Sequence, residues 1–169
     1  MNLNSKMRII RKTIKADLEE VFNLIYVSFS NMAESDLVKQ LISDEDVLIN
    51  LVIETSDIIV GNIVVSKLTM EPDVGLFCGG VAPLSVLPEH QSSGVGTQLM
   101  HEAIKKSQEM KIDALFLLGN PNYYKKFNFI ISDLESDYSA EHFQQLELTK
   151  GCLINLKSKI TYANAFLSL

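Results

Sequence analysis

The sequence predicts one mixed α/β domain in which helices cover both faces of a mostly antiparallel sheet. The chain has 169 residues, so we expect a single domain over residues 1–169. Amphipathic segments with helical spacing lie on both sides of a block of Ile- and Val-rich segments. Short polar turns separate the runs within that block, which indicates an antiparallel meander rather than alternating strands and helices.

The first elements are expected to be a short strand and two helices. The strand is predicted at residues 8–12. Apolar residues then recur three and four positions apart over residues 16–29 and again over residues 34–42, which is the spacing of a helix with one buried face.

The periodicity changes after these helices. Residues 47–54 and 58–70 are rich in Ile and Val, and a three-residue polar turn separates them. A third apolar run, residues 74–87, stops at Pro88. We therefore expect three successive antiparallel strands.

The second half of the chain returns to helix. Residues 94–110 carry an apolar stripe and a charged face, and residues 114–118 form a short apolar run typical of a buried strand. A compact turn and helix are expected at residues 120–127. Beyond these, residues 146–148 and 152–156 are predicted strands.

Composition narrows the choice of partners. The net charge is −6, whereas duplex nucleic acid and anionic membranes are bound through clustered Lys and Arg, so neither is expected as a partner. The longest uncharged apolar run, residues 75–88, contains Gly and Pro and falls short of the roughly 20 residues of a membrane helix. The first twelve residues contain no signal-peptide pattern, so we expect a cytoplasmic protein.

The cysteines indicate neither a disulfide framework nor a metal site. Cys78 and Cys152 lie far apart, no CxxC occurs, and no histidine is near either of them. We expect both thiols to be reduced and no metal to be bound.

Residues 86–97, with the sequence VLPEHQSSGVGT, connect the third strand to the long helix. The first turn of a helix presents free backbone N–H groups and the positive end of the helix dipole. Gly94 and Gly96 remove the side chains that would keep an anion away from those amides. The loop therefore fits a diphosphate, and such a cradle requires no lysine. An ordinary tight turn would also account for two glycines here.

Other phosphate motifs fit this loop less well. A P-loop needs GxxxxGK[ST], and no Gly-Lys-Ser/Thr occurs in the chain. A dinucleotide fingerprint needs GxGxxG, but Leu99 stands where the third glycine belongs. We therefore disfavour a dinucleotide-dependent enzyme.

Residues 91–96, QSSGVG, fit the pattern Q/R-x-x-G-x-G/A, and residues 124–129, YKKFNF, are similar to Y-x-x-x-G-F. Both patterns are signatures of the GNAT N-acetyltransferase superfamily, which the chain resembles over residues 7–129. Asn128 replaces the usual Gly, and Asn tolerates a positive φ better than most residues. Residues 119–124 and 162–166 resemble a bacterial branch of predicted N-acetyltransferases.

The resemblance implies a GNAT-like fold and transfer of an acetyl group from acetyl-CoA to an amine by direct attack. It implies that the strand before the loop splays from its neighbour and binds the pantetheine arm, while the loop amides bind the diphosphate. It further implies a backbone N–H near Val86 as the oxyanion donor and Tyr124 as the catalytic acid, because a phenol stays protonated at neutral pH. The implied cofactor-binding residues are Leu84, Ser85, Val86, Leu87, Gln91, Ser92, Ser93, Gly94, Val95, Gly96, Thr97 and Asn122.

Several alternatives stay open at this stage. Tyr123 is the alternative acid, and no general base stands out among Glu34, Asp36 and the three histidines. A non-catalytic module with a GNAT-like fold that binds or senses acyl-CoA is the alternative function. The acceptor is expected to be a small-molecule or peptide amine, and a homodimer is a common default.

Overall fold

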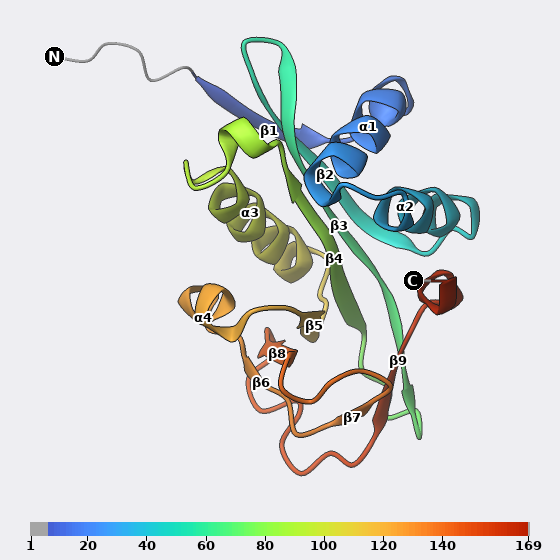
Figure 1. The fold of residues 1–169 in the computed structure, drawn as a ribbon. Coiled ribbons are helices and arrows are strands. Elements are labelled where there is room, and N and C mark those ends of the chain that lie inside the picture. Colours follow the sequence, from blue (N-terminus) through green and yellow to red (C-terminus); the bar gives the residue numbers. More distant parts are fainter. Residues whose placement is uncertain (1–6, 169) are drawn as a thin grey trace, which may run out of the picture.

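The computed structural model describes residues 7–168 of the chain (Figure 1). The helices are α1 (Leu18–Phe29), α2 (Ala33–Ser43), α3 (Val95–Glu109) and α4 (Pro121–Tyr124). The strands are β1 (Arg8–Lys12), β2 (Val47–Thr55), β3 (Ile58–Glu71), β4 (Cys78–Val86), β5 (Ala114–Leu118), β6 (Ile130–Ile131), β7 (Glu135–Ser136), β8 (Phe143–Glu147) and β9 (Lys159–Tyr162).

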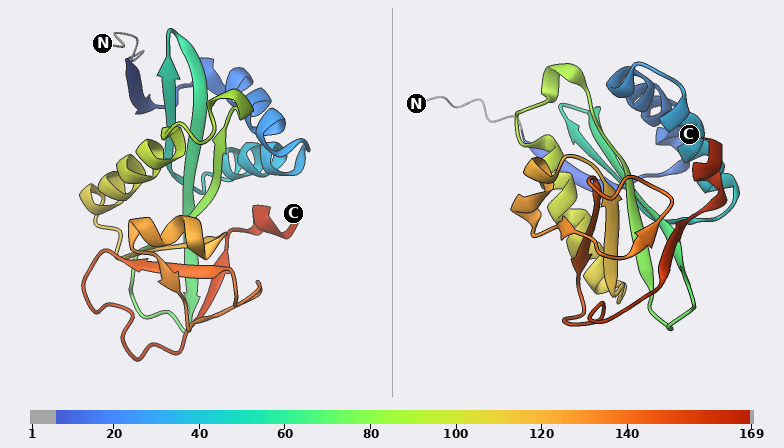
Figure 2. Two further views of the ribbon diagram at one scale, coloured as in Figure 1. Left: turned by 60° about the vertical axis from the view of Figure 1, so that its left-hand side comes forward. Right: turned by 60° about the horizontal axis from the view of Figure 1, so that its bottom comes forward.

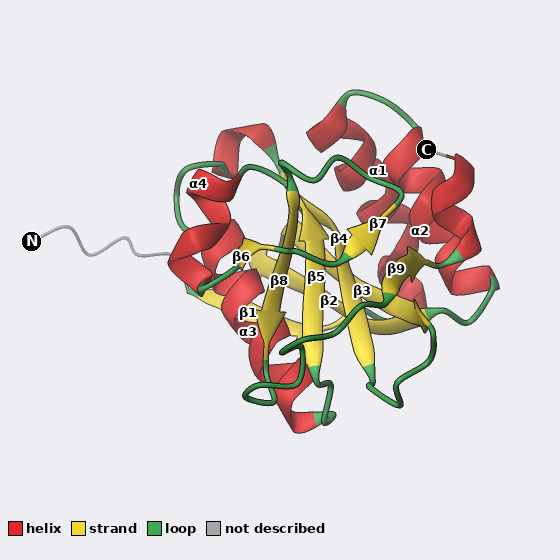
Figure 3. Cartoon of the chain, turned by 90° about the horizontal axis from the view of Figure 1, so that it is seen from below, coloured by secondary structure: helices red, strands yellow, loops and turns green. Residues whose placement is uncertain are grey.

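The main sheet has the strand order β1-β2-β3-β4-β5-β8-β6 (Figure 3). Only the β4–β5 pair in this order is parallel. Strands β2, β3 and β4 form the predicted antiparallel meander, and Ser56 and Asp57 make the β2–β3 turn with positive φ at both positions. The last four residues of β3 leave this sheet and pair with β9.

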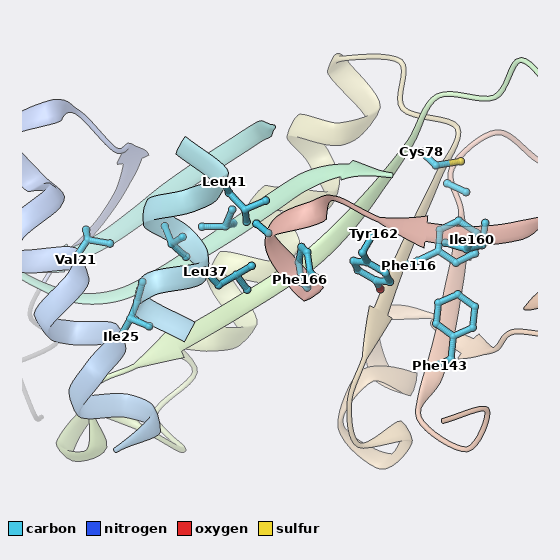
Figure 4. Close-up of a cluster of buried hydrophobic side chains, with 14 of the residues drawn as sticks. Val21, Ile25, Leu37, Leu41, Cys78, Phe116, Phe143, Ile160, Tyr162 and Phe166 are labelled. Carbon is cyan, nitrogen blue, oxygen red and sulfur yellow. The ribbon is translucent and has the colours of Figure 1, made fainter. Parts of the chain in front are cut away.

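Helices cover both faces of the sheet, as the sequence predicts. Helices α1 and α2 lie on one face and α3 on the other (Figures 1 and 2). The buried stripe of α3 contains Leu99, Met100 and Ala103, at the spacing expected for one helix face. The sheet thus separates two hydrophobic clusters, of which the one beneath α1 and α2 continues to Phe116 and Phe143 beyond β4 (Figure 4).

The predictions for the end of the chain are partly wrong. Residues 152–156 form a turn rather than a strand, because the Glu147 carboxylate accepts hydrogen bonds from the backbone N–H groups of Gly151 and Leu153, both at 2.9 Å. The strand predicted at residues 146–148 begins earlier, at Phe143. The third meander strand starts at Cys78, so residues 74–77 belong to the preceding loop. Over residues 7–168, no helix has the length and apolar character needed to cross a membrane.

Candidate active site

Strands β4 and β5 diverge at the centre of the molecule. Their parallel pairing covers Cys78, Gly79 and Gly80 of β4, whereas β4 continues to Val86. The opposite edge of β4 stays paired with β3 as far as Val86, after a register shift that gives β4 one extra residue. No other described strand pairs with the β5-facing edge of β4 beyond Gly80. An extended ligand can therefore lie along this edge as an added strand would.

The loop after β4 is tied down on both sides. Arg8 of β1 donates to the carbonyl and the hydroxyl of Ser93, at 2.9 and 3.0 Å. The Gln91 side-chain amide donates back to the carbonyl of Val86 at 3.1 Å, and the Ser93 hydroxyl donates to the carbonyl of His90. These contacts hold the loop so that the first amides of α3 are presented at a fixed place.

Gly94 is the N-cap of α3 and adopts φ +89°, a left-handed conformation that favours glycine. No side chain hydrogen-bonds the first turn as a cap, so the N–H groups at the start of α3 remain available to a ligand. At Gly96, a Cβ would lie 2.9 Å from the Tyr123 hydroxyl, which shows how closely α4 approaches this turn.

Strand β4, the loop, the end of α1 and α4 line an open cavity of about 430 Å³. Its lining includes the part of β4 that has no partner on the β5 side and the start of α3. The residues that line it are Ser28, Phe29, Leu84, Val86, Gln91, Ser92, Gly94, Gly96, Thr97, Tyr123, Tyr124 and Lys126.

Five of the predicted cofactor-binding residues do not line the cavity. The side chains of Ser85 and Val95 are buried in the core, and Leu87 packs against it. The Ser93 hydroxyl is used inside the loop, as described above. Asn122 is exposed on α4, where its N–H donates to the Asn120 side chain.

Tyr124 reaches the cavity from the short helix α4. Asn120 caps this helix, Pro121 occupies its first position, and Asn128 takes the left-handed turn after it with φ +67°. The Tyr124 ring lies directly against Gly119, where any Cβ would overlap it. The ring also makes T-shaped contacts with Tyr123 and Phe129, at centroid distances of 4.9 and 6.1 Å.

The two tyrosines differ in what their hydroxyls contact. Burial raises the pKa of Tyr124 to about 12, with a smaller contribution from Tyr123, so this phenol stays protonated at neutral pH. Burial also raises the pKa of Tyr123, and a hydrogen bond with Thr97 opposes that rise. Among residues 7–168, no hydrogen bond engages the Tyr124 hydroxyl. Tyr124 also lines the cavity, so its protonated phenol can donate to a ligand there.

The family model described as acetyltransferase (GNAT) domain matches residues 9–131, which include the loop and the Tyr124 segment. The chain belongs to the GNAT acetyltransferase family. The match covers the diverging strands, Gly94 and Tyr124 of this GNAT domain.

Two curated relatives from Escherichia coli K12 are both named uncharacterized N-acetyltransferases. YjhQ is 29% identical over 120 residues, which make up 69% of this chain and 66% of YjhQ, so about a third of that protein lies outside the match. YhbS is 29% identical over 122 residues, or 72% of each chain.

Solved GNAT structures share the fold. The crystal structure of YhbS from Escherichia coli in complex with CoA has a TM-score of 0.91 at 25% identity, over 96% of this chain and 93% of that one. A GNAT acetyltransferase from Brucella melitensis in complex with acetyl-CoA has a TM-score of 0.81 at 24% identity, over 95% and 99% of the two chains.

The residues of this GNAT domain fit coenzyme A. The unpaired edge of β4 suits the pantetheine arm, and the uncapped amides at Gly94 and Gly96 suit the diphosphate. Over residues 7–168, no cluster of His, Cys, Asp and Glu could hold a metal ion.

The carboxylates and histidines considered as bases lie outside the cavity lining. Asp36 is exposed and pairs with Lys39 at 2.8 Å, while His101 is exposed and packs edge-on against Phe127. Glu34 is half-buried and has one oxygen that is buried without a partner, but it does not line the cavity. His90 and His142 are likewise outside the lining. No general base is assigned.

Three lining residues were missed in the sequence. Ser28 and Phe29 end α1, and the Ser28 hydroxyl donates to the carbonyl of Val86 at 3.0 Å where α1 packs on β4. Their pattern indicates only a helix face. Lys126 lies within the YKKFNF segment, but nothing in that segment distinguishes it from Lys125.

Proposed function

We propose that this GNAT protein transfers the acetyl group of acetyl-CoA to a primary amine by direct attack of the amine. The observation that supports this most strongly is that one cavity joins the unpaired edge of β4, the uncapped start of α3 and the Tyr124 phenol. When bound, acetyl-CoA supplies an activated thioester. The chain has to bind it, orient it and manage protons.

The main chain performs the binding in this proposal. The stretch from Leu84 to Leu87 holds the pantetheine arm, and amides between Gln91 and Thr97 hold the diphosphate. A backbone N–H near Val86 faces the developing negative charge on the acetyl oxygen. Hydrogen-bond donors fixed before the reaction stabilise such charge without having to reorganise.

Tyr124 holds the proton that the departing sulfur requires. With its pKa raised to about 12, the phenol is protonated throughout the physiological range. The amine must arrive neutral, and its proton leaves through water, since no described base lines the cavity.

The proposal also covers the acceptor, the binding partners and the cellular location. We propose a small-molecule or peptide amine as the acceptor, with neither nucleic acid nor a membrane as a partner, and a homodimer acting in the cytoplasm. The net charge of −6 is compatible with a cationic amine.

The test is Tyr124→Phe, assayed for amine-dependent thiol release from acetyl-CoA over an amine library. We expect turnover to fall about a hundredfold, because general acid catalysis contributes roughly 10²–10⁴-fold, while the Kd for acetyl-CoA stays unchanged. Tyr138→Phe is the matched control, because Tyr138 packs against Tyr162 away from the cavity. Unchanged turnover in Tyr124→Phe would remove the acid role, and a fall confined to Tyr123→Phe would transfer it to Tyr123.

A non-catalytic acyl-CoA-binding module is the second candidate, favoured by the lack of a described base in the cavity lining. It predicts that acetyl-CoA raises the melting temperature while no amine in the library releases thiol. A ligand at 100 times its Kd adds roughly 2.7 kcal/mol of stability, which thermal unfolding detects readily. NAD serves as the negative control.

A further inference from the structure

Lys126 is the one charged side chain among the described residues that line the cavity. The other lining groups are apolar, hydroxyl, phenol, amide or main chain. A helix N-terminus contributes only about half an elementary charge, whereas the diphosphate of the proposed donor carries about two negative charges. Because the chain has a net charge of −6, a cation in the cavity lining favours the binding of a negatively charged ligand there.

Lys126 is held beside the start of α3. Its Nζ donates to the Thr97 hydroxyl at 2.9 Å and lies 4.0 Å from the centroid of the Tyr123 ring. Thr97 is the third residue of α3, so the ammonium stands next to the uncapped amides. An ammonium group has three N–H donors, and after the bond to Thr97 two remain for phosphate oxygens.

These contacts position the ammonium in advance. A free lysine side chain loses considerable rotamer freedom when it binds a ligand, which weakens the binding. The hydrogen bond to Thr97 and the cation–π contacts with Tyr123 and Phe127 already restrict this side chain.

We propose that Lys126 binds the diphosphate of the acetyl donor together with the first amides of α3, an inference that rests on the proposed function. Lys126 lies two residues after Tyr124, in the 3₁₀ turn Lys125–Phe127 that continues α4. The same contact therefore joins the segment that carries the acid to the helix that carries the cofactor.

Calorimetric titration of CoA into Lys126→Met and Lys126→Arg tests the contact directly. We expect Lys126→Met to raise the Kd about tenfold at low salt, because a charge-assisted bond to phosphate is lost. The affinity should also depend less on salt, since screening acts on one charge fewer. Lys126→Arg should stay within about threefold of the wild type. Lys125→Met is the matched control, because Lys125 is exposed and lies outside the cavity lining.

Fragments of the donor identify the group that Lys126 contacts. Dephospho-CoA lacks the 3′-phosphate but keeps the diphosphate, and pantetheine lacks both. We expect the Lys126→Met penalty to persist with dephospho-CoA and to vanish with pantetheine, each tested as a competitor of acetyl-CoA. Because both compounds carry a free thiol, this competition assay follows the loss of the thioester instead of the release of thiol. A penalty that vanishes with dephospho-CoA would assign the contact to the 3′-phosphate and overturn the proposal. An equal penalty with pantetheine would reduce Lys126 to a structural role and overturn it too.

Wild-type binding separates this inference from the proposed function. If the wild type binds CoA tightly and Lys126→Met binds equally well with the same salt dependence, the lysine assignment alone fails. If the wild type binds neither CoA nor acetyl-CoA, the proposed function fails, and the inference fails with it.

Discussion

One wall of the cavity is formed by main chain and the other by aromatic side chains. At the start of α3 the wall is main chain, shaped by Gly94 and Gly96 and held by Arg8 and Gln91. At α4 the wall consists of side chains packed on one another, with the ring of Tyr124 against Gly119. A main-chain wall presents fixed dipoles for binding, whereas a packed aromatic wall places one hydroxyl. We therefore expect substitutions in the main-chain wall to change mainly the Kd for acetyl-CoA, and substitutions in the aromatic wall to change mainly kcat.

Gly119→Ala should have the largest effect. A Cβ at this position overlaps the Tyr124 ring, so the ring has to move. Displacement of a catalytic group by about 1 Å can cost roughly a hundredfold in rate, and we expect kcat to fall by about that factor. Stability should fall by about 1–3 kcal/mol because of overpacking. Steady-state kinetics together with urea unfolding would measure both changes.

Gly94→Ala is the comparison variant on the other wall. A Cβ at Gly94 would make only an ordinary van der Waals contact, 3.7 Å from the Arg8 guanidinium, but the residue adopts φ +89°, so alanine is strained there. We expect a higher Kd for acetyl-CoA with a much smaller change in kcat. Equal losses of kcat in both variants would show that the walls do not act separately.

Gln144→Met should have a moderate effect through Gly119. Gln144 is fully buried in β8, and its amide donates to the carbonyl of Gly119 at 2.9 Å, while its own carbonyl oxygen has no partner. Methionine removes the support beneath Tyr124, so kcat should fall several-fold. The lost hydrogen bond and the removed unpartnered carbonyl offset each other, so stability should stay within about 1 kcal/mol. A loss above about 3 kcal/mol in urea unfolding would contradict this account.

Gln145→Met is the control for Gln144. Gln145 follows it on the strand, and its side chain accepts a hydrogen bond from the Ser132 hydroxyl. This variant should leave kcat unchanged.

The smallest expected effect is on alkaline stability. Burial raises the pKa of Tyr124 from 10.0 to about 12, so the folded state keeps this proton after the unfolded chain has lost it. The contribution of the Tyr124 proton to the free energy of unfolding is therefore complete below about pH 10. It declines as the pH rises toward 12. Tyr124→Phe should lose less stability than the wild type between pH 8 and pH 10.5, as measured by urea midpoints. Parallel losses in the two proteins would show that Tyr124 is not desolvated.

The main-chain wall could be predicted from the sequence because its determinants are local. The break at Pro88, Gly94 at the N-cap and the apolar stripe of α3 all lie within one short stretch, and the structure places them as expected. The meander is equally local, since a two-residue turn sets the register of β2 and β3.

The aromatic wall could be predicted only in part. Tyr124 was found through its segment, but its support by Gln144 comes from a strand twenty positions further along the chain. Ser28 reaches Val86 only because α1 packs on β4. The strand predicted at residues 152–156 failed for a similar reason: the carboxylate of Glu147 draws the backbone into a turn that apolar periodicity does not reveal.

The length of β3 has a consequence for folding during synthesis. Its last four residues, Leu68 to Glu71, take β9 as their partner, and β9 is made long after β3 has left the ribosome. Until then this stretch exposes an open strand edge, with Met70 and its neighbours uncovered, and such edges pair readily with other chains. A released chain truncated before residue 159 should therefore aggregate more readily, or engage chaperones longer, than the chain that includes β9.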